Sequence, residues 1–413
     1  MARKMKDSGI EWIGEIPEGW EVVPVKRLCT MQAGKNLTSE QIAPEGTYPV
    51  YGGNGIRGFF SDYNCDGQFL TVGRQGALCG NVHKINGKVW ATEHAVITTP
   101  SSYTILDFLY FLLIGMDLNQ YVSSTAAQPG LAVGTLLNLK TCYPCSTLEQ
   151  TQISNYLNAK CSEIDVMLSK IRSSIEEYKK LKQAVITQAV TKGVRGEREM
   201  KDSGVEWIEE IPKEWVIQKI KSISSRINVG VVIRPSEYFD ENGTVPFLRG
   251  INVKEYLISS DNMVYINESS NRILSKSQVH TDDILIVRDG SIGTSCVVPA
   301  EFDGANVVSM VIATPSISCD SRFICYSLNS DVGKTQFTLT KIGSALTHTS
   351  VSAVSDIIVA VPSCAEQKEI ADYLDAKCVE IDGLIAKKEQ LVKELESYKK
   401  SLIYEVVTGK REV

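Results

Sequence analysis

Arginine and amide side chains lie beside glycine-rich turns at several places in the chain, each time after a run that is typical of a strand. The arginines are Arg57, Arg74, Arg249 and Arg288. A guanidinium on such a loop can bind guanine O6 and N7 or a phosphate. The neighbouring amides are Asn54, Gln75 and Asn252. Because a carboxamide can pair bidentately with adenine, this combination is typical of a surface that recognises nucleic acid bases.

A polar segment around residue 348 is a second candidate for such contacts. His348 lies between Ser344 and Ser350 in a run of small polar residues. This run could contact DNA or form only a solvated loop. We include Ser291, Lys341 and Thr347 in the same set of expected DNA-binding residues.

The sequence lacks the motifs that accompany common catalytic chemistry. It has no Gly-x-x-x-x-Gly-Lys-Ser/Thr phosphate loop and no Asn/Asp-Pro-Pro-aromatic motif of the amino-methyltransferases. Its four histidines show no His-Glu-x-x-His spacing, and no Gly-x-Ser-x-Gly turn accompanies them. Cys142 and Cys145 form a lone Cys-x-x-Cys pair without a second pair at zinc-finger spacing. We expect no catalytic residue, metal site or cofactor in this chain.

Charge sets a condition on any DNA-binding hypothesis. The formal net charge is −6, and neither variable segment is basic: residues 29–140 carry six Lys/Arg against seven Asp/Glu, and residues 224–360 carry ten against fourteen. Phosphate contacts supply most of the salt-dependent affinity for DNA. A DNA-binding role therefore requires a partner that contributes phosphate contacts, or basic residues concentrated on one face.

Two segments of the chain recur and reveal an internal duplication. Met5–Pro17 matches Met200–Pro212 at eleven of thirteen positions, at an offset of 195 residues, and Glu149–Asp165 recurs as Glu366–Asp382 at an offset of 217. The blocks between these repeats share almost no sequence. The duplication predicts one scaffold that presents two related but different surfaces.

The second repeat begins a long helical pattern in each half. Apolar residues step by alternating four and three positions, which is typical of a coiled coil. The residues that we expect in its seam are Leu157, Ile164, Leu168, Ile175, Leu374, Ile381, Ile385 and Val392. A helix of about 43 residues spans roughly 65 Å. We predict that the two helices pair antiparallel with each other; the alternative is that each packs on its own domain.

The remaining sequence predicts α+β domains of short strands, turns and a few helices. Residues 48–51, 68–72 and 283–287 are typical of strands, and Leu106–Leu113 of a helix. We expect two globular target-binding domains, 1–145 and 194–362, separated by two long helices, 146–193 and 363–413. Together these form a pseudo-two-fold internal repeat.

Composition predicts a protein of the cytoplasm. At 413 residues with 43% hydrophobic content there is enough material for two cores. No apolar run approaches the length of a transmembrane helix, and the N-terminus lacks the apolar stretch of a secretory signal. Eleven scattered cysteines are typical of a reducing compartment, and Cys161 and Cys378 are expected to be small buried hydrophobic residues.

The motifs together resemble one family. The lead EWIGEIPEGWEVVPVKRL, the segments YPVYGGNGIRGFF and FLTVGRQGALCGNVH, and the helix start EQTQISNYLNAKCSEID resemble the DNA-specificity subunit of type I restriction-modification enzymes. The second half is similar to the same family in the same order, with VPFLRGINV, ILIVRDGSIGTSCVV and EQKEIADYLDAKCVEID. The resemblance covers essentially the whole chain.

The resemblance implies a non-catalytic subunit with two target recognition domains, each reading one half of a bipartite DNA sequence. The two helices would set the unspecified spacer. The implied partners are double-stranded DNA, two modification (methyltransferase) subunits and, for cleavage, a restriction subunit. S-adenosylmethionine would belong to the methyltransferase, and ATP and Mg to the restriction subunit. Because the variable blocks differ, the target would be asymmetric.

Two other classes of function remain as alternatives. A coiled-coil scaffold could present loop domains to a protein or a glycan, which the acidic blocks would favour. A single-chain methylation and cleavage enzyme is the other, although its motifs are missing.

Overall fold

The computed structural model describes residues 3–76, 79–122, 130–341 and 348–413. The chain divides into two compact units. Unit 1 comprises residues 1–172 and 389–413, and unit 2 comprises residues 173–388. Both combine helices and strands, as the α+β prediction requires, and the division falls inside two long helices.

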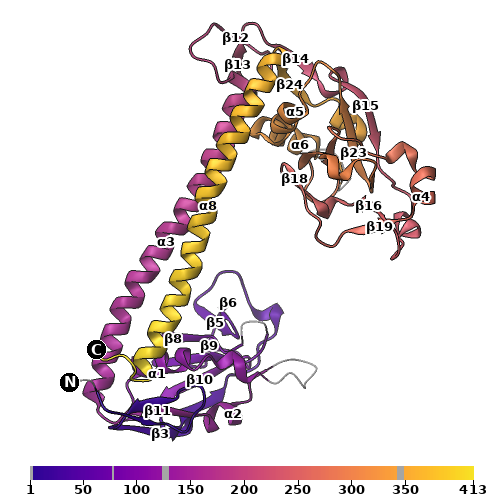
Figure 1. The fold of residues 1–413 in the computed structure, drawn as a ribbon. Helices are drawn as coiled ribbons and strands as arrows, with labels where there is room; N and C mark the ends of the chain where they lie inside the picture. The colour runs from indigo at the N-terminus through magenta and orange to yellow at the C-terminus, as the bar shows by residue number, and fades with distance from the viewer. Residues whose placement is uncertain (1–2, 77–78, 123–129, 342–347) are drawn as a thin grey trace. The chain divides into compact units, whose positions relative to one another are not determined.

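The two long helices are α3 (Thr147–Lys192) and α8 (Cys364–Val407) (Figure 1). Each begins at a serine whose side-chain oxygen accepts a hydrogen bond from the backbone N–H three residues on, Ser146 from Glu149 and Ser363 from Glu366, both at 3.4 Å. Gly193 and Gly409 follow the helix ends with φ of +78° and +71°, as residues that close a helix often do. α3 lies within the predicted helical segment 146–193 and α8 within the predicted segment 363–413.

Unit 1 contains eleven strands and two shorter α-helices among its described residues. They are β1 (Met5–Asp7), β2 (Glu15–Pro17), β3 (Trp20–Pro24), β4 (Cys29–Ala33), β5 (Tyr48–Gly52), β6 (Gly55–Phe60), β7 (Gln68–Gly73), β8 (Val82–Asn86), β9 (Trp90–Ala91), β10 (Ala95–Pro100), β11 (Lys140–Pro144), α1 (Leu106–Gly115) and α2 (Val133–Asn138).

Unit 2 repeats this plan with insertions. Its elements are β12 (Met200–Asp202), β13 (Glu210–Pro212), β14 (Val216–Lys219), β15 (Ser224–Val229), β16 (Val245–Leu248), β17 (Val253–Lys254), β18 (Leu257–Ile258), β19 (Val264–Ile266), α4 (Glu268–Ile273), β20 (Ile284–Val287), β21 (Ser295–Val297), β22 (Asn306–Val307), β23 (Met310–Pro315), α5 (Ser321–Asn329), α6 (Asp331–Lys341), α7 (Val351–Ser355) and β24 (Ile358–Val361).

The two units share one sheet topology. Unit 1 has an antiparallel sheet in the order β4-β10-β7-β8 and a three-stranded sheet in the order β6-β5-β9. Unit 2 has β15-β23-β20-β21 and β19-β16-β22. In both three-stranded sheets the middle strand pairs in parallel with one neighbour, β5 with β9 in unit 1 and β16 with β22 in unit 2. The blocks between the repeats, which share almost no sequence, therefore fold alike.

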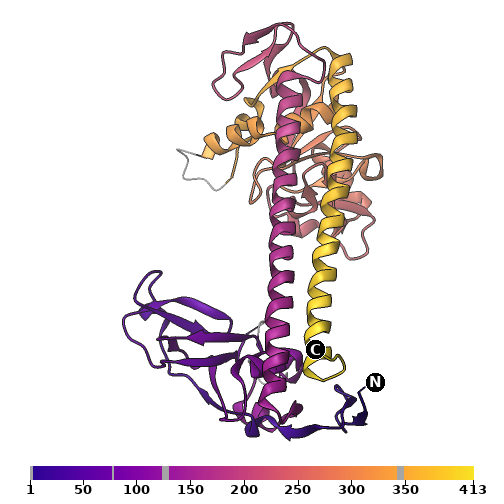
Figure 2. The same cartoon turned by 90° about the vertical axis from the view of Figure 1, so that its left-hand side faces the viewer.

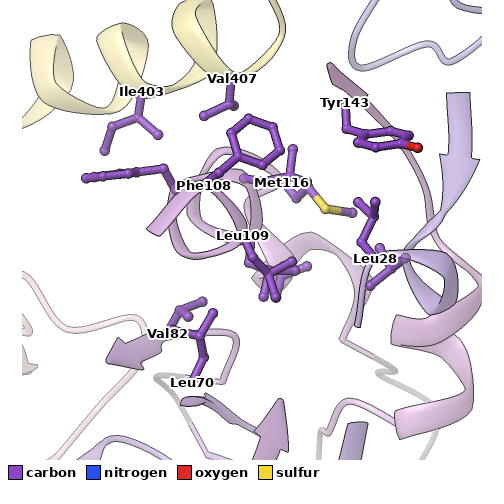
Figure 3. Packing of buried hydrophobic residues seen from close by; sticks show 14 of the residues in the cluster. Leu28, Leu70, Val82, Phe108, Leu109, Met116, Tyr143, Ile403 and Val407 are labelled. Atoms are coloured by element: carbon purple, nitrogen blue, oxygen red, sulfur yellow. The ribbon is translucent and has the colours of Figure 1, made fainter. Parts of the chain in front are cut away.

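The core of unit 1 joins the globular part to both long helices. Phe108, Leu109 and Leu112 of α1 are fully buried, and Figure 3 shows Phe108 close to Ile403 and Val407 of α8. Gly115 ends α1 where a Cβ atom would lie 2.7 Å from Val407 Cγ2, so the close approach of α1 to α8 requires glycine. Each half of a long helix thus belongs to a globular core, which is why the compact units differ from the four predicted segments.

Within each unit the helices also contact each other (Figure 2). In unit 1, Leu157, Ile164 and Leu168 are buried in the same cluster as Leu402, and Val392 packs against it. In unit 2, Ile175, Leu374 and Ile381 are buried and Ile385 is partly buried. The helices therefore contact both the other helix and a globular part, so that neither of the two predicted alternatives applies alone.

An equivalent ion pair joins the two helices in each unit; its lysine belongs to α8 in unit 1 and to α3 in unit 2. Lys399 Nζ lies 2.6 Å from Asp165 in unit 1, and Lys182 Nζ lies 2.7 Å from Asp382 in unit 2. The offset of 217 makes Lys182 equivalent to Lys399 and Asp165 equivalent to Asp382. In unit 1, Arg172 also pairs with Glu396 at 2.5 Å. Because partner numbers fall on α8 as they rise on α3, the helices run antiparallel within unit 1.

A paired carboxylate lies at each helix start; it is buried at Glu366 and partly buried at Glu149. In unit 2, Glu366 is 2% exposed, pairs with Arg198 at 2.6 Å and accepts a hydrogen bond from the Trp215 indole at 3.2 Å. Arg198 lies over the Trp215 ring, 5.3 Å from its centre. Arg198 and Trp215 flank the Met200–Pro212 repeat, at the offset of 195 residues from Arg3 and Trp20, and the helix repeat supplies Glu366.

Unit 1 contains the same arrangement. Glu149 pairs with Arg3 and accepts from the Trp20 indole at 3.0 Å, and Arg3 lies 5.5 Å from the Trp20 ring centre. The glutamine that follows each glutamate is buried and donates to the carbonyl of a preceding proline, Gln150 to Pro144 and Gln367 to Pro362, both at 3.0 Å. These bonds fix where each helix leaves its globular part.

None of the helices in the described part of the chain has both the length and the apolar character that crossing a bilayer would need.

We predict that Glu366→Ala destabilises the protein by about 3 kcal/mol, because it leaves the Arg198 charge and the Trp215 N–H without their buried partner. Chemical denaturation of the full chain would measure this. The matched control is Glu369→Ala, since Glu369 is exposed and pairs with Arg195 at the surface; it should change stability by less than about 1 kcal/mol. Equal losses in the two variants would contradict the role of the buried carboxylate.

Candidate nucleic-acid interface

A cavity of about 600 Å³ in unit 1 brings together three of the predicted DNA-binding residues. Asn54, Arg57 and Gln75 line it, together with His94 and Ile56. These residues come from three places in the fold: the turn and strand after β5, the loop after β7, and the residue before β10. The sequence predicted these polar side chains individually, and the fold places them around one opening.

Close backbone approach gives this cavity its shape. A Cβ atom on Gly53 would lie 2.8 Å from the Gln75 carbonyl oxygen, so the turn between β5 and β6 can meet the loop after β7 only with glycine at this position. Asn54 and Arg57 are exposed, and Asn54 accepts a hydrogen bond from Asn81 at 2.7 Å. His94 lies 3.1 Å from Glu93.

The side chains around the cavity suit the recognition of base edges and phosphates. They include a guanidinium, two carboxamides and an imidazole, which between them donate and accept hydrogen bonds, and one apolar side chain, Ile56, which is 58% exposed. Such groups discriminate base edges in a groove of DNA. They contain no nucleophile paired with a base, and no group of three or more potential metal ligands occurs in the described ranges.

Arg74 and Arg288 have the same local structure in the two units. The Arg74 carbonyl accepts from the Leu131 N–H at 2.9 Å, and its Nε donates to the Leu131 carbonyl at 3.2 Å. Arg288 makes the same two bonds with Thr349, at 3.1 and 2.9 Å. Both arginines therefore hold a neighbouring backbone segment in place, and only their terminal guanidinium nitrogens are left for DNA.

Arg249 and Asn252 support a loop. Asn252 is fully buried; its amide oxygen accepts from the Arg249 N–H at 3.1 Å, and its nitrogen donates to the carbonyls of Ser259 and Asp261 at 3.1 and 2.9 Å. The Arg249 guanidinium donates to the Asn262 carbonyl. The predicted pairing of Asn252 with adenine does not fit this burial, and we do not include Asn252 among the proposed DNA contacts.

The other predicted residues of unit 2 lie partly outside the described residues. Ser291 is exposed after β20, and the backbone of His348 pairs with that of Asp289. Thr347 and the side chain of Lys341 are outside the part of the chain that the structure describes. Their contacts with DNA stay a prediction.

A larger cavity of about 1290 Å³ in unit 1 suits phosphate less well. It lies between the globular part and the two helices. Three of its four basic residues, Lys84, Arg172 and Lys399, are each paired with a carboxylate, at 2.8, 2.5 and 2.6 Å, and the fourth, Lys400, is exposed. Burial lowers the pKa of His83 in its wall, which favours the neutral ring. The smaller cavity with the exposed Arg57 is therefore the better candidate for DNA.

The two cysteines of the Cys-x-x-Cys pair have different surroundings. Cys142 is buried and Cys145 exposed, and burial raises the pKa of Cys142 to about 12. So high a pKa disfavours the thiolate that disulfide exchange needs. Cys161 and Cys378 are buried, as predicted, and burial raises the pKa of each thiol.

Sequence reasoning missed three residues of the candidate surfaces: His94 and Ile56 in unit 1, and Asp289 in unit 2. A signal for Asp289 was present, because Arg74-Gln75-Gly76 and Arg288-Asp289-Gly290 both have the form Arg-x-Gly after a strand. No comparable pattern marks His94, whose position depends on the pairing of β10 with β7.

Comparisons with known proteins place the chain in a family. The family model described as the type I restriction modification DNA specificity domain matches it twice, at residues 17–177 and 212–395. The chain belongs to this family, the specificity subunits of type I restriction-modification systems.

Individual relatives carry the same description. The EcoprrI specificity subunit of Escherichia coli is 44% identical over 121 residues, which are 28% of this chain and 30% of that protein. The MjaVIII specificity subunit of Methanocaldococcus jannaschii is 24% identical over 417 residues, covering 96% of this chain and 93% of the relative. The chain thus matches the first relative only locally and the second over nearly its whole length.

Solved structures support the same fold. A chain from a study of complex assembly and conformational transition in the type I system has a TM-score of 0.71 and 13% identity, covering 96% of this chain and 99% of that one. The HsdS subunit of Thermoanaerobacter tengcongensis has a TM-score of 0.50 and 14% identity, covering 98% of this chain and 100% of the other. At these identities the likeness concerns the fold alone.

We predict that Asn252→Ala lowers the free energy of unfolding by about 2 kcal/mol, because two backbone carbonyls and one N–H lose the hydrogen bonds that the buried Asn252 amide makes with them. The exposed Asn54→Ala should change stability by less than about 0.5 kcal/mol. Thermal or chemical denaturation of the two variants would distinguish them. If Asn252→Ala were as stable as the wild type, the assignment of Asn252 to loop support would be wrong.

Proposed function

We propose that the protein is the sequence-reading subunit of a type I restriction-modification complex and that each globular part reads one half of an asymmetric bipartite DNA site. One observation carries this proposal. Units 1 and 2 have the same sheets in the same order, yet different side chains occupy the loops that would face DNA. A common backbone with different loop chemistry is what two readers of different sequences need.

The polar cavity of unit 1 supports DNA as the ligand. Arg57 is exposed at its edge beside Asn54 and Gln75, and these are the side chains that bind guanine and adenine in the major groove. We propose DNA contacts for Asn54, Arg57 and Gln75, for the terminal nitrogens of Arg74, Arg249 and Arg288, and for Ser291, Lys341, Thr347 and His348.

We further propose that α3 and α8 form one antiparallel coiled coil that sets the spacer between the half-sites. The buried residues at alternating spacing and the two equivalent ion pairs support this. Helices of 46 and 44 residues span roughly 65 to 70 Å. A separator of this length would hold the two readers on distant parts of one DNA duplex.

The partners that we propose are two methyltransferase subunits and, for cleavage, a restriction subunit. Apolar side chains exposed on the long helices support contacts with other chains: Val166 and Met167 are each 51% exposed, and Val379 is 74% exposed. The net charge of −6 also favours partners that supply phosphate contacts.

The chemistry would then belong to the partners. We propose that this chain is not catalytic and holds no cofactor, with S-adenosylmethionine bound by the methyltransferase and ATP and Mg by the restriction subunit. We place the complex in the cytoplasm, where a chain with eleven free cysteines stays reduced. The alternative of a scaffold for protein or glycan has no support in the comparisons.

Exchange of residues 224–360 for the corresponding block of a relative tests the modular reading. We expect the sequence methylated by the complex to change in one half only, because the other reader is untouched. Methylome sequencing of a host that carries the exchanged chain and its methyltransferase would measure this. A change in both halves, or in neither, would contradict the assignment of one half-site to each block.

The length of the long helices tests the spacer proposal. Insertion of seven residues after Arg172 and seven after Lys388 adds about 10 Å while preserving the heptad register, and the spacer should lengthen by about three base pairs at about 3.4 Å each. The control is an insertion of seven residues in α3 alone, which mismatches the helices and should abolish assembly. If the spacer length were unchanged with both insertions present, the proposal that the helices set the spacer would be wrong.

A further inference from the structure

Gln75 and Asp289 occupy the same position in the two units. Each follows an arginine after the third strand of the four-stranded sheet, β7 or β20. Each pairs through an isolated antiparallel bridge, Gln75 with Gly130 and Asp289 with His348. Each precedes a glycine with positive φ, +89° at Gly76 and +75° at Gly290.

Backbone hydrogen bonds establish this equivalence without any sequence alignment. The last residue of β7, Gly73, donates to the Asn81 carbonyl at 2.8 Å and accepts from Gly80 at 2.8 Å. The last residue of β20, Val287, donates to the Thr294 carbonyl at 2.9 Å and accepts from the Gly293 N–H at 3.0 Å. The arginines that follow each hold a backbone segment by the same two bonds.

Gln75 and Asp289 each have a neighbouring residue at the same position in the fold, but these neighbours differ in chemistry. His94 precedes Ala95, which pairs with Gly73, and Ser309 precedes Met310, which pairs with Val287. His94 and Ser309 are therefore equivalent as well. His94 and Gln75 line one cavity, and the Ser309 hydroxyl donates to one carboxylate oxygen of Asp289 at 3.1 Å. The side chain of Asp289 is exposed.

We infer that this shared position selects one base in each half-site, adenine through Gln75 and cytosine through Asp289. The inference rests on the proposed function. In the major groove adenine presents a donor at N6 beside an acceptor at N7, and a carboxamide, which both accepts and donates, matches this pair. Cytosine presents the N4 donor. An ionised carboxylate only accepts, so it matches cytosine and is repelled by the N7 of a purine.

The acidic side chain is otherwise unfavourable on a DNA-binding loop. A carboxylate near phosphates raises the free energy of the complex unless a base amino group donates to it. Ser309 occupies one carboxylate oxygen and orients the group, which leaves the other oxygen for cytosine N4. The carboxylate thus excludes other bases at the cost of some general affinity for DNA.

The test is the base preference of the full chain with its methyltransferase partner on duplexes that vary at one base pair in each half-site. Exchange of residues 224–360 first assigns the half-sites to the units. The wild type should prefer cytosine at one position of the unit 2 half-site by about tenfold or more. Asp289→Asn, which keeps the shape and an acceptor for Ser309, should remove that preference and favour adenine at the same position.

The reciprocal variant is Gln75→Glu, which should lose an adenine preference of similar size in the unit 1 half-site and gain one for cytosine. The matched control is Glu301→Gln, which removes one exposed negative charge elsewhere in unit 2 and should leave every base preference unchanged. Thermal denaturation of each variant verifies that it is folded.

The outcomes separate the two hypotheses. If the complex methylates an asymmetric site but Asp289→Asn leaves its base preferences unaltered, the inference alone is overturned. The same holds if Asp289→Asn changes the base preference in the unit 1 half-site, or if the unit 2 half-site contains no preferred cytosine. Absence of any sequence-selective methylation by the wild-type complex would instead refute the proposed function.

Discussion

An ion pair at the start of each long helix, buried in unit 2 and partly buried in unit 1, is the contact on which the rest of the structure depends. Glu149 and Glu366 lie at the first turn of α3 and α8, and each accepts hydrogen bonds from an arginine and a tryptophan of a distant lead segment. A buried carboxylate is costly unless it is paired. The pairing therefore fixes the lead segment, the helix start and the globular part as one body.

The side chains next to Arg74 and Arg288 can vary between the units while the backbone keeps its geometry. The hydrogen bonds of Arg74 and Arg288 to neighbouring backbone hold the loops after β7 and β20 in the same geometry in both units. Because this geometry depends on backbone atoms and on one arginine, the side chains next to it are free to differ. Gln75 and Asp289 differ in charge, yet each forms an isolated antiparallel bridge, with Gly130 and with His348.

Much of the fold followed from the sequence, since periodicity and repeats are local signals. The long helices and the strand at residues 283–287 were predicted because the spacing of apolar residues determines them. The common topology of the variable blocks was not predicted. It depends on long-range strand pairing between residues such as Val96 and Ala33, which no short pattern encodes.

The candidate site was predictable in part for the same reason. The pattern of arginine and amide side chains beside glycine turns indicated Arg57 and Gln75 individually, and only the fold places both around one cavity. Asn252 is also an amide residue beside a glycine turn, but its own loop folds over it and buries the amide. Whether a polar residue points outward or supports its own loop depends on packing partners that are remote in sequence.

The exchanged ion pairs on the long helices have an evolutionary consequence. Lys399 with Asp165 and Lys182 with Asp382 are one residue pair formed twice, with the roles of the helices reversed. Such reciprocity is the mark of a surface that is complementary to itself. A single ancestral half could therefore have associated with an identical copy and bound a palindrome, and fusion of two copies would have freed each reader to diverge toward a target of its own.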